Sequence, residues 1–505
     1  MKYIIGIDAG TSNVKAVLFD VEGNELLTRS IENEPNYIGE VEVEQDMNLL
    51  WAKVKSCIKN VVEDGEASKD DIIGIGVTGQ GEGVWLIDEQ GEPVQDAILW
   101  CDGRAADEVA KVTEEQPEIG KLIYDITGTP ALTGTQLMLL KWMHSNRKEA
   151  LDRAATSFFC KDWVRYNLTG EVSADLSDSG TSLLDSSKGT VSKEIFEALG
   201  LGDYVKIIPQ PVASHDLAGK LTEEVADQLG LNPGTPVAAG AIDVIAAAVG
   251  IGVVDVKDIC CILGTTCANE VFFKKEDCEF GKEGSRYEKH AVGDLFVNLA
   301  PTMNGTPNLD WILGEIVNMD DYSAVDALIN SVPAGSGGVI YHPYISAAGE
   351  RAPFYNPNAK ANFFGLTAQT GKAELTRAVY EGITYSIKDC LQGADKNSRV
   401  FLAGGGAQSP VWAQMISDIL GMEVVISDGN ELGAKGAAMI LGVAVGEYKD
   451  YHEAAEKCCR SLKVYEPNKE INAVYEAFFP LYQEIRKANM SLWNTRAAIM
   501  KQITK

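Results

Sequence analysis

The sequence predicts an α/β fold made of two domains of similar architecture with a cleft between them. Three observations support this prediction. The chain has 505 residues, which is too many for one hydrophobic core. Strand-like and amphipathic helix-like segments alternate along it, which is typical of a sheet flanked by helices. A strand, a Gly-Thr turn and a second strand occur near the N-terminus and again about halfway along the chain. We place the domain boundary after residue 245, which gives domains 1–245 and 246–505.

The first half begins with a predicted β-meander. The runs "KYIIGIDAG" and "VKAVLFD" read as strands joined by an Asp-Ala-Gly-Thr turn, and a third strand follows "EGN". The segment "DMNLLWAKVKSCIKNVVED" spaces its apolar residues every three or four positions, as an amphipathic helix does. A buried strand, "IIGIGVTGQ", and a hairpin, "VWLIDEQGEPV", are predicted next.

The second half repeats the pattern. Residues 260–273, "CCILGTTCANEVFF", again predict a strand, a Gly-Thr turn and a strand. Residues 399–421, "RVFLAGGGAQSPVWAQMISDILG", predict a strand, a glycine turn and a helix, with Ser409 as N-cap and Pro410 in the first turn. No linker rich in proline or serine separates the two halves, so we expect tightly joined domains.

The bulk composition excludes several classes of function. With 45% hydrophobic and 23% charged residues the chain is typical of a globular protein, and its net charge of −29 argues against nucleic acid or acidic membranes as partners. Asp8 interrupts the apolar N-terminal run and Asp243 the most apolar internal one, so we expect neither a secretory signal nor a membrane span. Ten cysteines without a CxxC pair and five scattered histidines predict reduced thiols in a cytoplasmic protein and argue against a protein-built zinc site.

The two Gly-Thr turns are candidate phosphate-binding sites. A hairpin tip with glycine and threonine offers backbone N–H groups and a hydroxyl to an anion, and two tips at matching places can grip one polyphosphate. An aspartate beside such a tip can hold the water shell of a Mg²⁺ ion that bridges phosphates, and Asp8 is in that position. Taken alone, Asp8 is equally a solvated acid at a strand end. No GxxxxGK[ST] segment occurs, and the glycine-rich segments "GQGEGVW" and "GGGAQSP" both miss the GxGxxG spacing of a dinucleotide-binding turn.

In this order, these residues resemble the FGGY carbohydrate kinases, which have two ribonuclease-H-like domains of the actin–hexokinase superfold. The resemblance covers nearly the whole chain. It rests on both phosphate segments, on "GERAPF", and above all on "ANFFGLTAQTGKAELTRAVYEG", which fits the C-terminal signature of the family. The N-terminal signature near "LMLLKWMHSN" fits less well, because its lysine directly precedes Trp142, whereas the usual pattern has two residues between them.

The resemblance implies a role for each of these segments. It makes Asp243 the catalytic base, although an aspartate before a helical run is also a common N-cap. It makes "GGGAQSP" the adenosine-binding turn, which taken alone is an ordinary turn between strand and helix. The residues that bind ATP are then Gly10, Thr11, Ser12, Lys15, Gly264, Thr265, Thr266, Gly405, Gly406, Ala407 and Gln408. Lys15 is also consistent with a solvated position on its strand.

The segments "GQGEG" and "LWCDGR" fall where the family binds its sugar. They imply substrate contacts by Gln80, Gly81, Glu82, Trp100 and Asp102, together with Asp243. D-Xylulose kinases tend to carry Gln-Met-His-Gly in the first segment, and glycerol kinases tend to carry Arg-Glu at its middle positions. Here the carboxylate Glu82 is kept and its neighbour is a glycine. A carboxylate accepts hydrogen bonds from two adjacent hydroxyls, which suits an open-chain polyol or ketose. Glu82 also fits an ordinary surface turn, and Trp100 an ordinary core position.

The sequence therefore predicts an ATP- and Mg²⁺-dependent kinase that phosphorylates a terminal hydroxyl of a small linear sugar or polyol. The variants "GQGEGVWLID" and "AIDV" look most like L-xylulose and erythritol-type kinases, so L-xylulose is the first expectation, with a tetritol and then D-xylulose as alternatives. An actin-like ATPase without a sugar acceptor is the alternative from a different class, and a degenerate sugar-binding regulator is a third. The family often forms dimers, and the sequence leaves a homodimer, the stereochemistry of the sugar and the role of the C-terminal tail open.

Overall fold

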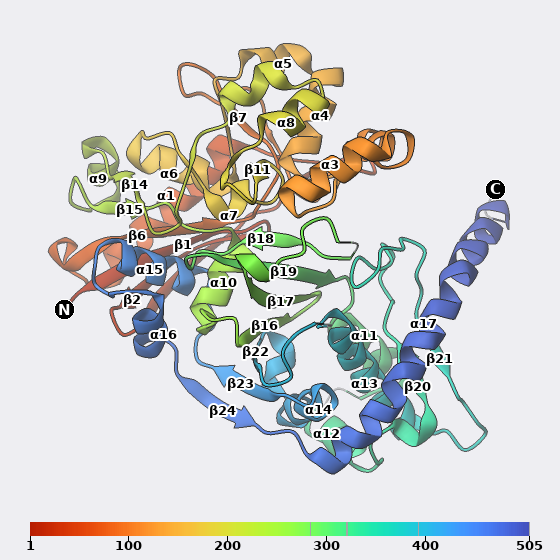
Figure 1. Ribbon diagram of the computed structural model, residues 1–505. Coiled ribbons are helices and arrows are strands. Elements are labelled where there is room, and N and C mark those ends of the chain that lie inside the picture. The colour runs from red at the N-terminus through yellow and green to blue at the C-terminus, as the bar shows by residue number, and fades with distance from the viewer. Residues whose placement is uncertain (283, 320–321, 392, 504–505) are drawn as a thin grey trace. The chain divides into compact units, whose positions relative to one another are not determined.

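The computed structural model describes residues 1–282, 284–319, 322–391 and 393–503, which form two compact units (Figure 1). Unit 1 contains Met1–Val254, Phe273–Val297 and Asp428–Arg460, and unit 2 contains Asp255–Phe272, Asn298–Ser427 and Ser461–Lys505. The chain therefore enters each unit more than once. The division into domains 1–245 and 246–505 stays a prediction.

Unit 1 is built on a mixed sheet with the strand order β14-β15-β6-β1-β2-β3. Strands β1, β2 and β3 form the predicted antiparallel meander, and β6 runs parallel to β1. The strands are β1 (Tyr3–Ala9), β2 (Asn13–Asp20), β3 (Glu25–Glu32), β6 (Ile72–Gly79), β14 (Leu217–Lys220) and β15 (Pro236–Ala238). The hairpin, the third strand and the buried strand β6 are confirmed.

A helix from near the C-terminus covers this sheet. Helix α15 (Leu432–Ala444), blue in Figure 1, packs on the red strands β1 and β6. A side chain at Gly76 of β6 would place its Cβ 2.0 Å from the carbonyl oxygen of Ala437, so only glycine allows the helix to approach this closely. One face of the first sheet is therefore covered by a helix that lies far from its strands in the sequence.

Further helices cover the sheet of unit 1 and build a second hydrophobic core beside it. Helix α1 (Met47–Asp64) is the predicted amphipathic helix, and Asp46 caps it by accepting a hydrogen bond from the backbone N–H of Leu49. The other helices are α2 (Ala106–Ala110), α3 (Pro117–Thr127), α4 (Gln136–Asn146), α5 (Lys148–Arg153), α6 (Cys160–Thr169), α7 (Leu176–Ser179), α8 (Lys193–Ala198), α9 (Glu223–Leu229), α10 (Asp243–Ile251) and α16 (Tyr451–Cys458). Four small sheets lie among these helices. One has three strands, β4 (Asn36–Ile38), β5 (Glu42–Gln45) and β8 (Ala97–Ile98), and three have two strands: β7 (Trp85–Ile87) with β9 (Thr156–Phe158), β10 (Ala174–Asp175) with β13 (Pro211–Val212), and β11 (Leu184–Asp185) with β12 (Thr190–Val191). The predicted hairpin "VWLIDEQGEPV" is reduced to β7 with a single bridge from Ile87 to Pro93.

The second sheet has the strand order β18-β19-β17-β16-β22-β23-β24. Its strands are β16 (Asp258–Leu263), β17 (Cys267–Lys274), β18 (Tyr287–Lys289), β19 (Leu295–Thr302), β22 (Arg399–Ala403), β23 (Glu423–Ser427) and β24 (Ser461–Tyr465). The two sheets have the same arrangement of strands: β24, β23, β22, β16, β17 and β19 of the second sheet correspond in that order to β14, β15, β6, β1, β2 and β3 of the first. In both sheets a central antiparallel hairpin is followed by two parallel strands and an antiparallel edge strand. This confirms the predicted pair of domains with similar architecture.

Besides its strands of the second sheet, unit 2 contains mainly helices. They are α11 (Pro307–Trp311), α12 (Tyr322–Asn330), α13 (Lys372–Cys390), α14 (Pro410–Leu420) and α17 (Lys469–Ile503), with the strand pair β20 (Ile340–His342) and β21 (Asn362–Phe364). As predicted, α14 has Pro410 in its first turn and Ser409 as its N-cap. The C-terminal tail is the long helix α17, which packs on α13 and α14; Tyr475 and Tyr482 contact α13, and Asn472 donates a hydrogen bond to the carbonyl oxygen of Asp418 in α14. Its packing partners therefore include helices of its own unit.

Two expectations from composition can be compared with the structure. Within the described residues no disulfide bond joins the cysteines, most of which are buried. In the same part of the chain, no helix is both long and apolar enough to span a lipid bilayer.

Candidate active site

The tip of the first hairpin is held in a fixed shape by one buried residue, Asn33. The amide of Asn33 donates a hydrogen bond to the carbonyl oxygen of Gly10 (2.8 Å), and its backbone N–H donates to that of Ser12 (2.8 Å). Ser12 is exposed and Thr11 half-buried. Both bonds occupy carbonyl oxygens of the tip, so these oxygens point toward Asn33. The backbone of this candidate anion site is therefore already fixed by contacts within the protein.

Thr11 is bonded to two predicted substrate-binding residues. Its hydroxyl accepts a hydrogen bond from Nε1 of Trp100 (3.0 Å) and donates one to Oε1 of Gln80 (3.1 Å), and Gln80 donates in turn to Gln45 (2.8 Å). Trp100 is 42% exposed, so it is not a core residue. Thr11, predicted to bind ATP, therefore lies in contact with Gln80 and Trp100, which are predicted to bind the substrate.

Glu82 occupies an unusual backbone conformation. Its φ is +56°, in the left-handed region that costs a non-glycine residue about 1 kcal/mol or more. Its backbone N–H donates to Oδ1 of Asp178 (3.1 Å), and its Oε1 accepts from Nη2 of Arg286 (2.6 Å). Gly81 packs so closely on Ile242 that an added Cβ would lie 2.0 Å from Cδ1 of that residue. Glu82 is therefore a positioned and largely buried carboxylate, not the solvated turn residue considered from the sequence.

Two residues of this site were not predicted from the sequence. Arg286, just before β18, contacts Oε1 of Glu82 through Nη2 and Oε1 of Glu288 through Nε (2.7 Å). Glu288 lies within β18 and is fully buried. The sequence does contain a pattern that could have identified them. In "SRYEKH" every second residue is charged or titratable (Arg286, Glu288 and His290), and alternate residues of a strand share one face.

Asp243, the predicted catalytic base, is the first residue of α10. The N-cap is Ile242, so the alternative role of Asp243 as N-cap is wrong; its carboxylate instead accepts a hydrogen bond from the N–H of Val244 (2.8 Å). Burial raises the pKa of Asp243 to about 7, and the negative charges of Asp8, Glu288 and Glu82 raise it as well. A carboxylate with a pKa near neutrality is suited to accept a proton.

Asp8 lies at the end of β1, where its burial raises its pKa to about 6. The nearby Lys15 lowers this pKa and Glu431 raises it, and these two residues form an ion pair (2.6 Å). Among the described residues, no hydrogen-bond donor reaches the buried Oδ1 of Asp8. At Gly433, near the start of α15, an added Cβ would lie 2.7 Å from Oδ2 of Asp8, so no side chain fits there. A buried acceptor without a protein donor fits the water shell of a magnesium ion.

Asp102 is held by other residues of the protein. It is fully buried, its Oδ2 accepts from the N–H of Val43 (2.6 Å), and its Oδ1 accepts from Nε of Arg104 (2.8 Å). These bonds give Asp102 a positioning role in the loop that carries Trp100. Its direct contact with a substrate stays a prediction.

A fully buried ion cluster lies behind Glu82 and Asp243. Nζ of Lys161 contacts the carboxylates of Asp162 (3.0 Å), Asp175 (2.7 Å) and Asp178 (2.9 Å). Asp178 binds the backbone of Glu82, as described above. Asp175 accepts from the hydroxyl of Ser177, which itself accepts from the N–H of Ile242 (2.9 Å), the residue before Asp243. The cluster therefore fixes the backbone at both Glu82 and Asp243, and sequence inspection did not identify it.

In unit 2, the second Gly-Thr tip connects β16 to β17 and is held by a neighbouring loop. The N–H of Thr306 donates to the carbonyl oxygen of Gly264 (2.8 Å), and Thr265 and Thr266 are exposed. The predicted adenosine turn is the short helical segment Gly405–Gln408 between β22 and α14. In this turn Gly405 and Gln408 are exposed, Ala407 is half-buried and Gly406 is buried. Whether these residues bind ATP stays a prediction.

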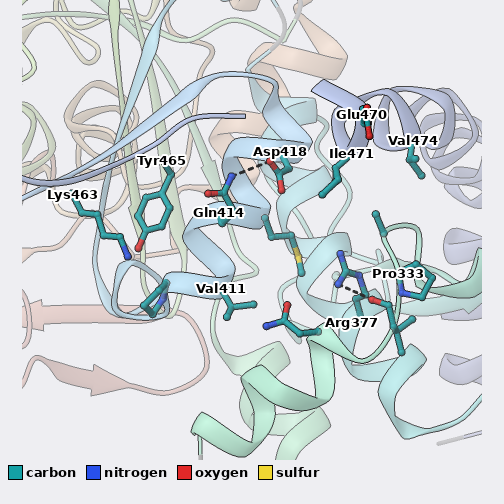
Figure 2. Close-up of a pocket in the computed structure, with 15 residues that line it drawn as sticks. Pro333, Arg377, Val411, Gln414, Asp418, Lys463, Tyr465, Glu470, Ile471 and Val474 are labelled. Atoms are coloured by element: carbon teal, nitrogen blue, oxygen red, sulfur yellow. Dashed lines mark hydrogen bonds between the residues drawn. The ribbon is translucent and has the colours of Figure 1, made fainter. Parts of the chain in front are cut away.

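Unit 2 also contains a pocket of about 810 Å³ beside α14 (Figure 2). Figure 2 shows Val411, Gln414 and Asp418 of this helix on its wall, with Gln414 bonded to Asp418. Arg377 also lines the pocket, but Glu381, Tyr475 and two backbone carbonyls already accept hydrogen bonds from its guanidinium. None of the predicted site residues belongs to the lining, and nothing in the pocket points to a particular ligand.

The described residues contain no group of three or more histidine, cysteine, aspartate or glutamate side chains arranged to hold a metal ion directly. A magnesium site through water at Asp8 does not require such a group.

Comparison with known proteins gives consistent matches. Models of the N-terminal and C-terminal domains of the FGGY family of carbohydrate kinases match residues 3–250 and 260–445. The chain is 30% identical to the erythritol kinase of Brucella abortus (98% of each chain), 29% to a xylulose kinase of Staphylococcus epidermidis (97% of each) and 28% to the probable L-xylulose kinase of Pasteurella multocida (97% of this chain, 99% of the relative). The structure of the xylulose kinase from Lactobacillus acidophilus superposes with a TM-score of 0.89 at 24% identity, covering 98% of this chain and all of the other. The structural likeness shows the same fold, with two ribonuclease-H-like domains.

Proposed function

We propose that this chain, which belongs to the FGGY family of carbohydrate kinases, transfers the γ-phosphoryl group of ATP to a terminal hydroxyl of L-xylulose or a closely similar linear sugar. The observation that carries this proposal is the group of carboxylates in unit 1. Asp243, with a pKa near 7, lies within electrostatic reach of Asp8, Glu82 and Glu288. This group combines a proton acceptor with acceptors for hydroxyl groups and for a hydrated cation.

Each residue has a defined role in the proposed mechanism. Glu82 and Gln80 orient the sugar by accepting its hydroxyl protons, and Trp100 supplies an apolar wall. Asp243 accepts the proton of the attacking hydroxyl as the phosphoryl group is transferred in line. The backbone N–H groups of the two Gly-Thr tips bind phosphates, and the turn Gly405–Gln408 binds the adenosine. A magnesium ion held through water by Asp8 would neutralise phosphate charge when bound.

The names of the relatives support two other substrates. Relatives named for erythritol and for xylulose match the chain about as well as the one named for L-xylulose. A tetritol and D-xylulose are therefore the alternatives. An ATPase without a sugar acceptor remains the alternative from another class.

A single assay distinguishes these functions. ADP release is measured with L-xylulose, D-xylulose, erythritol, pentitols and hexuloses, and without any acceptor. We expect turnover that depends on the acceptor, with the highest kcat/KM for L-xylulose. ADP release that no acceptor changes would support the ATPase instead.

The assay is repeated with Asp243→Asn. This change removes the proton acceptor, so we expect kcat to fall at least ~100-fold while the KM for ATP stays within a factor of three, taking the low end for loss of a general base. A variant with unchanged kcat would exclude Asp243 as the base.

A further inference from the structure

The contact between Arg286 and Glu82 places a guanidinium at the proposed sugar site. Arg286 lies between two carboxylates: its Nη2 is 2.6 Å from Oε1 of Glu82 and its Nε is 2.7 Å from Oε1 of Glu288. Glu288 is fully buried, whereas 21% of the Arg286 side chain is exposed. The guanidinium is therefore paired on one side with the fully buried Glu288 and on the other with Glu82.

Arg286 determines where the carboxylate of Glu82 lies. The backbone of Glu82 is fixed by its bond to Asp178 and by its positive φ, so the side chain starts from one defined direction. Its Oε1 is then bound by Arg286. A carboxylate has two oxygens with about four acceptor positions, so its chemistry allows it to accept hydrogen bonds from substrate hydroxyls as well as from a guanidinium.

The charges of this group disfavour an acidic substrate. One guanidinium faces two carboxylates, so Arg286, Glu82 and Glu288 together carry one net negative charge. Asp243 and Asp8 add further acidic groups nearby. The positive charge of Arg286 is thus already balanced, and a carboxylate on the substrate would meet a net negative field. Hydroxyl groups, which donate hydrogen bonds, meet acceptors.

We propose that Arg286 determines the specificity of the sugar site: it positions the Glu82 carboxylate to accept hydrogen bonds from substrate hydroxyls, and its pairing with Glu288 makes the site select uncharged ketoses and alditols over aldonates. Arg286 acts through Glu82 and is therefore a positioning residue. The inference rests on the proposed function, because it requires that Glu82 contacts the sugar.

The test measures binding separately from turnover. Calorimetry without nucleotide gives the affinities of L-xylulose, erythritol, D-erythronate and D-gluconate for the wild type and for R286M, R286K and E288Q. R29M is the matched control, because Arg29 forms an ion pair with Asp64 at the surface of the same unit. We expect the wild type to bind at least one neutral compound and neither acid, and R29M to behave identically.

Each variant tests one part of the inference. R286M loses a charge-assisted hydrogen bond to Glu82, so it should bind the neutral compound roughly 30-fold more weakly, with R286K intermediate. E288Q leaves the guanidinium with one carboxylate, so the affinity for the aldonates relative to the neutral compound should rise about tenfold or more. In turnover, R286M should raise the KM for the sugar more than it lowers kcat.

The inference would be overturned if R286M bound the neutral compound with wild-type affinity. It would also be overturned if E288Q kept the wild-type preference for the neutral compound over the aldonates. Thermal unfolding shows whether each variant is folded, and if R286M is not, the comparison of R286K and E288Q with the wild type decides. The proposed function fails separately, if the wild type binds a neutral sugar but releases no additional ADP with any acceptor.

Discussion

Asp243 combines a functional advantage with a cost in stability. Its pKa is raised from the usual 3.8 to about 7, so the folded protein holds the proton more tightly than the unfolded chain does. The resulting stabilisation is fully present below pH 3.8 and is lost as the pH rises through 7. At pH 8 the native state therefore contains a destabilising charge.

Asp243→Asn should remove this cost. We expect the variant to be more stable than the wild type at pH 8, by at most about 4 kcal/mol, and the advantage to disappear at pH 4. Urea unfolding at both pH values measures this. An advantage of the same size at both pH values would show that the charge of Asp243 is not its cause.

Asp8 and Asp243 are coupled, because the charge of Asp8 raises the pKa of Asp243. Asp8→Asn should therefore lower that pKa and shift the acid limb of log(kcat/KM) for the sugar to lower pH, whatever the remaining rate. A pH series at saturating ATP measures the shift. An acid limb that stays in place would mean that the two carboxylates do not interact.

At the scale of elements, two helices support these aspartates: α10 begins with Asp243, and α15 contacts Asp8 through Gly433. The two helices pack on each other through small residues. An added Cβ at Gly436 of α15 would lie 1.7 Å from the carbonyl oxygen of Ala246 in α10. Gly314, in a helical segment of unit 2, has no atom within 4 Å of its added Cβ and so provides a matched control.

Gly436→Ala should force the helices apart and lower the free energy of unfolding by about 1–3 kcal/mol, with a parallel loss of activity. Gly314→Ala should leave stability unchanged or raise it by up to about 1 kcal/mol, since alanine favours helix. Thermal unfolding and ADP release measure both effects. If Gly436→Ala were as stable and active as the control, the close packing would not support the site.

Much of the fold could be predicted from local patterns. Alternation and turn residues identified the two hairpins, and Ser409 with Pro410 identified the start of α14. Local patterns were insufficient where a contact joins distant segments. Arg286 meets Glu82 only because β18 folds back into unit 1, and Lys161 meets three aspartates spread from the start of α6 to α7. The N-cap of α10 was placed one residue too late because aspartate is common at that position, whereas here the helix starts at Asp243 itself.

At the scale of the molecule, unit 1 depends on residues beyond the middle of the chain, because Asp428–Arg460 supply α15 and α16. A fragment of residues 1–254 would leave the faces of β1 and β6 that pack on α15 exposed. We expect this fragment to aggregate or to show no cooperative unfolding, and co-expression with residues 255–505 to restore activity. Circular dichroism during heating, and ADP release from the co-expressed pair, test this. A fragment that unfolds cooperatively on its own would show that α15 is dispensable.

The late arrival of α15 also affects synthesis. Strands β1 and β6 leave the ribosome long before α15, because the helix that covers them begins only at Leu432. The glycine-lined strip on β1 and β6 must therefore stay uncovered until residues 432–444 have been synthesised. A premature stop codon shortly before residue 428 would thus yield a product lacking a layer of its first domain.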